Sequence, residues 1–181
     1  MLTWSRQRRS AERIARALYG SSVTAARTPA LYKDLGIPDT LAGRFEMVVL
    51  NTFLLMHRLS AEGEAGRGLA QALAEAMTEQ LDDDMRQMGV SDVTVPKKIR
   101  KAASAAYGRF EAYAAALEAN DPAALAEALI RNVYDGDAGW SAEAAKLADH
   151  MLGAAATLRG WPSDRVMAGD VDLPQFGEIE P

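Results

Sequence analysis

Hydrophobic residues recur every three or four positions along most of this chain, which is the spacing of one face of an amphipathic α-helix. Between turn residues, the pattern predicts helices at 10–19, 29–35, 40–59, 69–88, 96–117, 122–133 and 141–160. No segment shows the sustained alternation that is typical of a β-strand. The sequence therefore predicts an all-α fold, a single-domain helical bundle of about six to seven helices.

Glycines, prolines and capping residues set the limits of these helices. Gly20 predicts the end of the first helix, and the three glycines of 63–68 predict a turn. Pro96 opens a helix, because proline fits the first helical turn, where its missing N–H has no intrahelical partner. Asp121 before Pro122 is typical of a helix N-cap. These signals are local, so they predict boundaries and say nothing of tertiary packing.

Three of the predicted helices are expected to form the core. The helix at 40–59 is apolar on nearly all sides, which is typical of a central helix. The helix at 96–117 has an apolar seam for a neighbouring helix, made of Ile99, Ala103, Ala106, Phe110, Tyr113 and Leu117. A stripe on the helix at 69–88 favours core packing, with an adaptable groove for an apolar client as the alternative; it consists of Leu73, Met77, Leu81, Met85 and Met88.

Charge divides the chain into regions of opposite sign. The net charge is −5, yet residues 1–28 hold six arginines and only one acid, Glu12. We therefore expect a basic N-terminal arm with a short helix (1–28), a helical body (29–160) and a loose C-terminal tail (161–181). A basic arm on an acidic body suits contact with anionic lipid or RNA.

Composition excludes several classes of protein. The chain has no cysteine, which excludes disulfides, thiolate nucleophiles and thiolate metal sites. No apolar run reaches the roughly 20 residues that a membrane-spanning helix needs. The start lacks the uninterrupted apolar core of a secretory signal, although its arginines are compatible with a transit peptide.

Glu46 is the carboxylate of greatest interest. On a helical wheel it falls in a largely apolar sector, near Leu50, Phe53 and His57. A buried carboxylate needs a partner, since its desolvation costs on the order of several kcal/mol. Arg44 points to another side, so the partner should come from another helix, with Arg86 and Arg109 as candidates. The pair would either fix the register of the helices or contact a client directly.

Four cations, Lys97, Lys98, Arg100 and Lys101, occupy the first turns after Pro96. They oppose the helix dipole there, at a cost of about 0.3–1 kcal/mol each when exposed. A cap by Asp92, nearby acids or the negative charge of a partner would offset this cost. The cluster is therefore either a solvated face or a docking patch for anionic lipid, ribosomal RNA or an acidic protein. It lacks the interleaved aromatic residues that stack on single strands.

The remaining candidates for chemistry are isolated. The three aspartates of 82–84 supply hard oxygens that suit Mg²⁺ or Ca²⁺, but no second acidic cluster accompanies them. His57 and His150 stand outside any HExxH motif, and the glycines of 63–68 lack the GK[ST] ending of a phosphate loop. We predict no catalytic residue, metal site or cofactor.

A series of short motifs follows a fixed order along the chain. It comprises Leu31-Tyr32, LGIPDT at 35–40, GRFE at 43–46, Asp82, RQMGV at 86–90, Asp92, VPKK at 95–98, YGR at 107–109, Tyr113 and LIRN at 129–132. In order and spacing, these motifs resemble the ubiquinol–cytochrome c chaperone family over about 29–158. The resemblance implies that 29–160 is a helical chaperone domain that binds newly made cytochrome b for assembly of ubiquinol–cytochrome c reductase.

The resemblance also implies where contacts are made. We assign client binding to the charged residues of the motifs, namely Arg44, Glu46, Arg86, Asp92, Lys97, Lys98 and Arg109. Docking to an anionic membrane surface or the ribosome, and not to DNA, is assigned to Arg6, Arg8, Arg9, Arg13, Arg100 and Lys101. The client would lie in an apolar groove bordered by these charges.

The expected protein is a non-enzymatic chaperone in the bacterial cytoplasm, peripheral to the inner membrane. A mitochondrial location is less favoured, because the family-like region begins soon after the start of the sequence. One rival is a membrane-associated helical adaptor for another client. A second is a Mg²⁺-dependent enzyme acting on isoprenoid diphosphates through the aspartates of 82–84.

Overall fold

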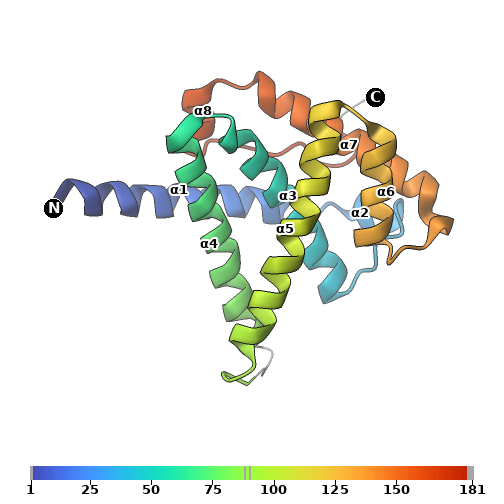
Figure 1. Ribbon diagram of the computed structural model, residues 1–181, viewed down its shortest axis with the longest axis horizontal. Helices are drawn as coiled ribbons and strands as arrows, with labels where there is room; N and C mark the ends of the chain where they lie inside the picture. The colour runs from blue at the N-terminus through green and yellow to red at the C-terminus, as the bar shows by residue number, and fades with distance from the viewer. Residues whose placement is uncertain (1, 88, 90, 179–181) are drawn as a thin grey trace.

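The structure, a computed structural model, describes residues 2–87, 89 and 91–178, with side chains from residue 8 onward (Figure 1). Within these residues it contains no strand. Six helices are 12 to 25 residues long and two are short: α1 (Leu2–Ala26), α2 (Pro29–Lys33), α3 (Leu41–Ser60), α4 (Gly63–Gln87), α5 (Val95–Ala119), α6 (Pro122–Val133), a 3₁₀ turn η1 (Ala138–Trp140), α7 (Ser141–Gly160) and α8 (Ser163–Ala168). The prediction of an all-α bundle of about six to seven helices is confirmed.

Helix α3 lies at the centre of the bundle. It packs against α1, α4, α5 and α7, and its buried side chains point in several directions, as the apolar pattern predicts. Thr40 caps the helix, its Oγ1 accepting a hydrogen bond from the Gly43 N–H at 3.2 Å. A Cβ at Gly43 would lie 2.0 Å from the carbonyl oxygen of Pro38, so glycine is required for this entry into the helix.

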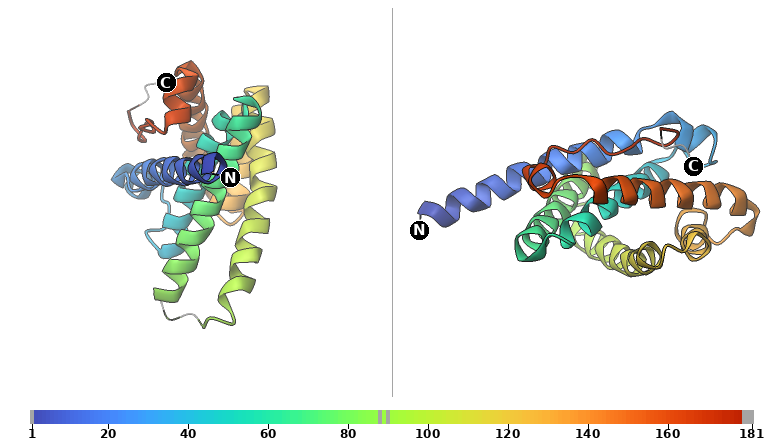
Figure 2. Two further views of the ribbon diagram at one scale, coloured as in Figure 1. Left: turned by 90° about the vertical axis from the view of Figure 1, so that its left-hand side faces the viewer. Right: turned by 90° about the horizontal axis from the view of Figure 1, so that it is seen from above.

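Helices α4 and α5 form an antiparallel hairpin whose end extends beyond the rest of the body (Figure 1). The first turns of α1 project from a different side, and the two additional views show the same separation (Figure 2). The basic arm and the cations at the start of α5 therefore do not form one continuous surface.

Two helices are longer than the sequence predicts. Helix α1 continues through Gly20 to Ala26, because the turns after Gly20 bury Ser22, Ala25 and Ala26, and such packing outweighs the low helix propensity of glycine. Helix α4 begins at Gly63, so the predicted turn at 63–68 is wrong. Within α4, a Cβ at Gly66 would lie 2.1 Å from the carbonyl oxygen of Leu59, so this glycine serves a close approach.

The C-terminal segment is packed, where a loose tail is predicted. After α8 the chain runs back beside α1 (Figure 2), and Val171 and Leu173 are buried. The N–H of Leu173 donates to the Ser21 Oγ at 3.1 Å. The ring of Phe176 meets the imidazole of His150 edge-on, at 5.4 Å between centroids. The sequence pattern missed this segment because its few apolar residues have no helical period.

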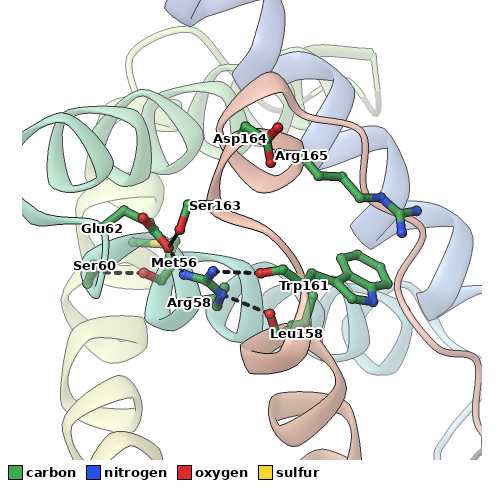
Figure 3. Close-up of polar contacts among 9 residues, drawn as sticks. All are labelled: Met56, Arg58, Ser60, Glu62, Leu158, Trp161, Ser163, Asp164 and Arg165. Atoms are coloured by element: carbon green, nitrogen blue, oxygen red, sulfur yellow. Dashed lines mark hydrogen bonds and ion pairs between the residues drawn. The ribbon is translucent and has the colours of Figure 1, made fainter.

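Arg58 joins the C-terminal end of α3 to the end of α7 (Figure 3). Its Nε donates to the carbonyl oxygen of Leu158 at 2.8 Å and its Nη2 to that of Trp161 at 3.2 Å. The guanidinium also pairs with Glu62, which accepts a hydrogen bond from Ser163 at 2.9 Å. These two donors, Arg58 first, hold the pKa of Glu62 below its usual value. Arg58 thus supplies side-chain donors at the end of α7, where the Leu158 carbonyl also accepts from the Trp161 N–H at 3.3 Å.

Candidate functional site

A groove of about 1090 Å³ opens between α1, α2, the first half of α3 and the halves of α4 and α5 nearest the hairpin end. Its lining is largely apolar and comes from four long helices: Tyr19, Val23 and Ala26 of α1, Leu41, Phe45, Val48 and Val49 of α3, Leu81 and Met85 of α4, and Ala102, Ala105 and Ala106 of α5. The predicted apolar groove bordered by charges is thus present in the structure.

The depth of the groove follows from the residues of α5. Ala102, Ala105 and Ala106 line it from that helix, and an alanine side chain ends at Cβ, so the space beyond it stays unfilled. Opposite them, Phe45 and Val48 are only half-buried although they belong to α3, the central helix of the bundle. An apolar surface left uncovered in this way is typical of a binding site for another chain or ligand.

Glu46 and Arg109 form an ion pair across the wall of the groove. The pair joins α3 to α5, and each side chain is 22% exposed. Arg109 is one of the two partners that the sequence predicts for Glu46, and the structure confirms it. Phe53, Phe110 and Tyr113 pack beside the pair through tilted and edge-on ring contacts. Burial raises the pKa of Tyr113 to about 12, so its hydroxyl stays protonated here.

Cations border the mouth of the groove on the side of α1 and α2. Arg44 lines it and pairs with Asp39 at 2.6 Å, and the hydrogen bond from this arginine holds the pKa of Asp39 below its usual value. Arg27 and Lys33 are also exposed at this edge. Asp84, from α4, lies on the opposite side and accepts a hydrogen bond from Gln80 at 2.9 Å.

The other predicted client-binding residues lie outside the groove, at the end of the hairpin. Arg86 pairs with Asp82 and Asp92, which leaves it unavailable to Glu46. Lys97 and Lys98 are exposed on the first turn of α5, and neither lines the groove. The structure therefore brings together Arg44, Glu46 and Arg109 and separates them from Arg86, Asp92, Lys97 and Lys98. Client binding by either group stays a prediction.

The predicted docking residues occupy two places. Arg100 and Lys101 lie exposed beside Lys97 and Lys98. Arg8, Arg9 and Arg13 are exposed on α1, where Arg8 pairs with Glu12 at 3.1 Å. The remaining docking residue is in the part of α1 whose side chains the structure does not describe; it is Arg6.

The methionine stripe of α4 is divided between core and groove. Leu73 and Met77 are buried, whereas Leu81 and Met85 are half-buried and line the groove. The last member of the stripe, Met88, lies outside the described residues. Core packing is thus confirmed for one half of the stripe, whereas the other half lines the groove and its binding of an apolar client stays a prediction.

Asp82 and both histidines, which the sequence analysis considered as candidates for chemistry, make contacts within the fold. Asp82 is paired with Arg86, and in the described part of the chain no three His, Asp or Glu side chains are placed to hold a metal ion. His57 packs against the ring of Phe53, and burial lowers its pKa. His150 is buried, which lowers its pKa to about 4. Among the described helices, none is long and apolar enough to span a bilayer.

Comparison with known proteins identifies the family. The sequence model of the ubiquinol-cytochrome C chaperone family matches residues 33–175, which is most of the chain. The chain belongs to this family. The resemblance seen in its short motifs is thereby confirmed, and the family region includes the packed segment that follows α8.

Two relatives of the chain carry names that agree with the family. A crystal structure of the Cbp3 homolog from Brucella abortus superposes with a TM-score of 0.86 at 35% identity, covering 99% of this chain and 98% of that one. The ubiquinol-cytochrome-c reductase complex assembly factor 1 of Xenopus laevis is 26% identical over 104 residues, 58% of this chain. The chain spans about half, 52%, of the length of the Xenopus protein.

Sequence analysis missed the part of the groove that α1 and α2 form. Tyr19, Val23 and Ala26 come from the part of α1 that sequence analysis placed at or beyond the end of a short helix. Arg27 and Lys33 were not singled out because they belong to no motif. The run of small residues after Gly20 is the one signal that could have been used, since small side chains on a helix permit close packing.

Proposed function

We propose that this protein is a non-enzymatic assembly chaperone for ubiquinol–cytochrome c reductase and that its groove holds a segment of newly made cytochrome b. Membership of the chaperone family supports the assembly role. The observation that carries the choice of site is the open apolar groove between α1, α3, α4 and α5. An unassembled membrane protein exposes apolar helix surface in water, and covering such surface is what a groove of this kind does.

The size of the groove limits what it can cover. A helix about 10 Å across rises about 1.5 Å per residue, so the volume has room for roughly two to three helical turns. A whole membrane span needs about 20 residues. The groove would therefore shield one stretch of the client, with the charges at its mouth meeting the polar residues that flank that stretch.

Site-specific crosslinking tests this assignment. The chain has no cysteine, so a single cysteine introduced as Leu81→Cys in the groove carries a photoreactive group at one known place. Lys146→Cys, on the exposed face of α7, is the matched control. During synthesis of cytochrome b beside the membrane, the groove position should crosslink to it and the α7 position should not.

A loss of function in cells tests the same site from the other direction. Leu81→Glu places a carboxylate in the groove, where it should repel an apolar client, while the half-buried position leaves the fold intact. A strain carrying this variant should contain less assembled cytochrome b with unchanged messenger. Normal levels of the assembled complex would contradict the proposal. Recovery of a different membrane protein with the chaperone would favour the rival adaptor role.

We keep the bacterial cytoplasm, beside the inner membrane, as the proposed location. The proposal rests on the expected client, a membrane protein that would be inserted into that membrane. The rival enzyme on isoprenoid diphosphates is tested by Asp83→Asn. A Mg²⁺-dependent binding of a diphosphate that this variant abolishes would overturn the non-enzymatic proposal.

A further inference from the structure

The end of the α4–α5 hairpin combines an exposed apolar residue with cations that form no ion pair among the described residues. Val93 lies in the connection between the two helices and is 89% exposed, more than any other large hydrophobic residue that the structure describes. The hairpin end is also the part of the body that reaches farthest from α7 and the C-terminal segment (Figure 1). A valine at such a projecting place gains nothing from the fold.

The cations beside Val93 are not used by the fold either. Lys97, Lys98 and Lys101 are exposed and form no ion pair with any residue that the structure describes, and the Arg100 Nε contacts only the carbonyl oxygen of Pro96, at 3.4 Å. Their positions in the first turns of α5 are unfavourable for that helix.

Four aspartates lie near the hairpin end, but none of them forms an ion pair with a cation of α5 among the described residues. Asp92, which could have offset the cations, pairs with Arg86, as does Asp82. Asp84 accepts a hydrogen bond from Gln80 on the side of the groove. Asp83 remains as an exposed acid on α4. With Arg86 included, the hairpin end carries five cations against four aspartates, a net charge of +1, and the exposed positive charge is concentrated on the first turns of α5.

We propose that the hairpin end is a membrane-contact surface, which places Val93 at the headgroup level of an anionic bilayer with the cations of α5 around it. Apolar residues flanked by lysine and arginine bind such interfaces by combining insertion with attraction to anionic lipid. The exposed valine distinguishes this partner from RNA, since phosphate contacts alone would leave Val93 in water.

This contact would set the position of the groove, a consequence that rests on the proposed function. Asp84 lies three residues from the end of α4 and Ala102 lies seven residues into α5. At about 1.5 Å per residue, the mouth of the groove lies roughly 5–10 Å from the hairpin end. A client segment that leaves the bilayer beside the hairpin end would therefore lie within reach of the groove.

Vesicle flotation tests the lipid contact without any client, so its result is independent of the proposed function. The full chain should float with vesicles of equal parts phosphatidylglycerol and phosphatidylcholine, remain unbound with phosphatidylcholine alone, and be released by salt. Each cation near an anionic surface contributes roughly five-fold to binding. The double variant Lys97→Glu/Lys98→Glu should therefore weaken binding by well over about 25-fold.

Two controls with the same change of charge locate the contact. Lys146→Glu/Arg159→Glu, on exposed positions of α7, should leave binding nearly unchanged. Arg9→Glu/Arg13→Glu tests the arm on α1. If the α1 variant abolishes flotation while Lys97→Glu/Lys98→Glu does not, the arm is the membrane contact and the proposal is overturned.

A fluorescent reporter at the apex decides whether Val93 meets lipid. In the cysteine-free chain, Val93→Cys carries a single environment-sensitive dye, whose emission should shift to the blue with the anionic vesicles. Tyr107→Cys, exposed on α5, is the matched control and should shift less. An unshifted apex dye, or tight Lys97-dependent binding of an oligouridine with no binding of vesicles, would overturn the proposal.

Discussion

The two ends of α3 lie in opposite surroundings. At its C-terminal end, Arg58 is only 10% exposed and donates hydrogen bonds to two carbonyl groups while it pairs with Glu62 (Figure 3). Toward its N-terminal end, Glu46 pairs with Arg109 at the edge of an uncovered apolar surface. The first pair lies where α7, α8 and the C-terminal segment close over the core, whereas the second borders the groove.

The two ends of α3 therefore differ in role. Contacts at the C-terminal end stabilise the fold, whereas the surface toward the N-terminal end stays open to a partner. In the closed half, Arg58 is satisfied by two backbone carbonyl groups and Glu62, and Leu147, Met151 and Leu158 of α7 are fully buried, so these contacts stabilise the fold. In the open half, apolar residues of α1, α3 and α4 remain half-buried, and covering them would take a partner. Substitutions that weaken the fold should therefore cluster on the closed side.

The largest expected effect is on the free energy of unfolding, and it should differ between a core leucine and a groove leucine. Leu147→Ala, in the fully buried core of α7, should lower the free energy of unfolding by about 3 kcal/mol, because it removes buried methyl groups and leaves a cavity. Leu81→Ala, in the half-buried wall of the groove, should cost well under about 1 kcal/mol. Urea unfolding followed by circular dichroism measures both, and equal losses would contradict the division into two halves.

The next effect concerns Arg58. Arg58→Met keeps much of the side-chain volume but removes the donors to Leu158 and Trp161. Losing these charged hydrogen bonds should lower the free energy of unfolding by about 2–3 kcal/mol. Arg44→Met is the matched control, since its pair with Asp39 is exposed, and it should leave stability unchanged. A stable Arg58→Met protein would show that packing alone closes this side.

His150 makes the closed side sensitive to acid. Its folded-state pKa of about 4 lies below the ordinary value of 6.5 because the imidazole is buried beside Phe176. The unfolded chain therefore binds a proton first, and the stability present above pH 6.5 should fall by about 1.4 kcal/mol per pH unit toward pH 4. Thermal melts between pH 7 and 5 test this, and His150→Gln should flatten the dependence.

The elements that depend on local chemistry were the ones that the sequence could predict. Helix α6 begins where Asp121 and Pro122 place it, and Thr40 caps α3 as expected. The continuation of α1 past Gly20 was not predicted, because glycine has a low helix propensity and the contacts between α1 and distant helices that outweigh it leave only the run of small residues after Gly20 as a signal. The packed segment after α8 was missed for the same reason, since Leu173 is held by a hydrogen bond to Ser21, which lies 152 positions away.

The site was predictable in part. The partner of Glu46 could be narrowed to two arginines because a buried carboxylate needs one, and Arg109 is the partner found. The separation of the Glu46–Arg109 pair from Lys97 and Lys98 could not be predicted. Helical spacing fixes which residues share a face of α5, but it does not fix how α5 packs against α3. The groove itself depends on how α1, α3, α4 and α5 pack against one another, which is a tertiary property.

The smallest expected effect comes from the ion pair of the open half. A double-mutant cycle with Glu46→Gln and Arg109→Gln should give a coupling of about 1 kcal/mol in the free energy of unfolding, because the pair is partly exposed.

Crosslinking of cytochrome b from Leu81→Cys in the same variants separates the two roles of the pair. A pair that only fixes helix register should leave crosslinking unchanged in the charge-swapped variant Glu46→Arg/Arg109→Glu, whereas direct contact with the client should reduce it. Zero coupling would mean that the pair does not join α3 to α5 in solution.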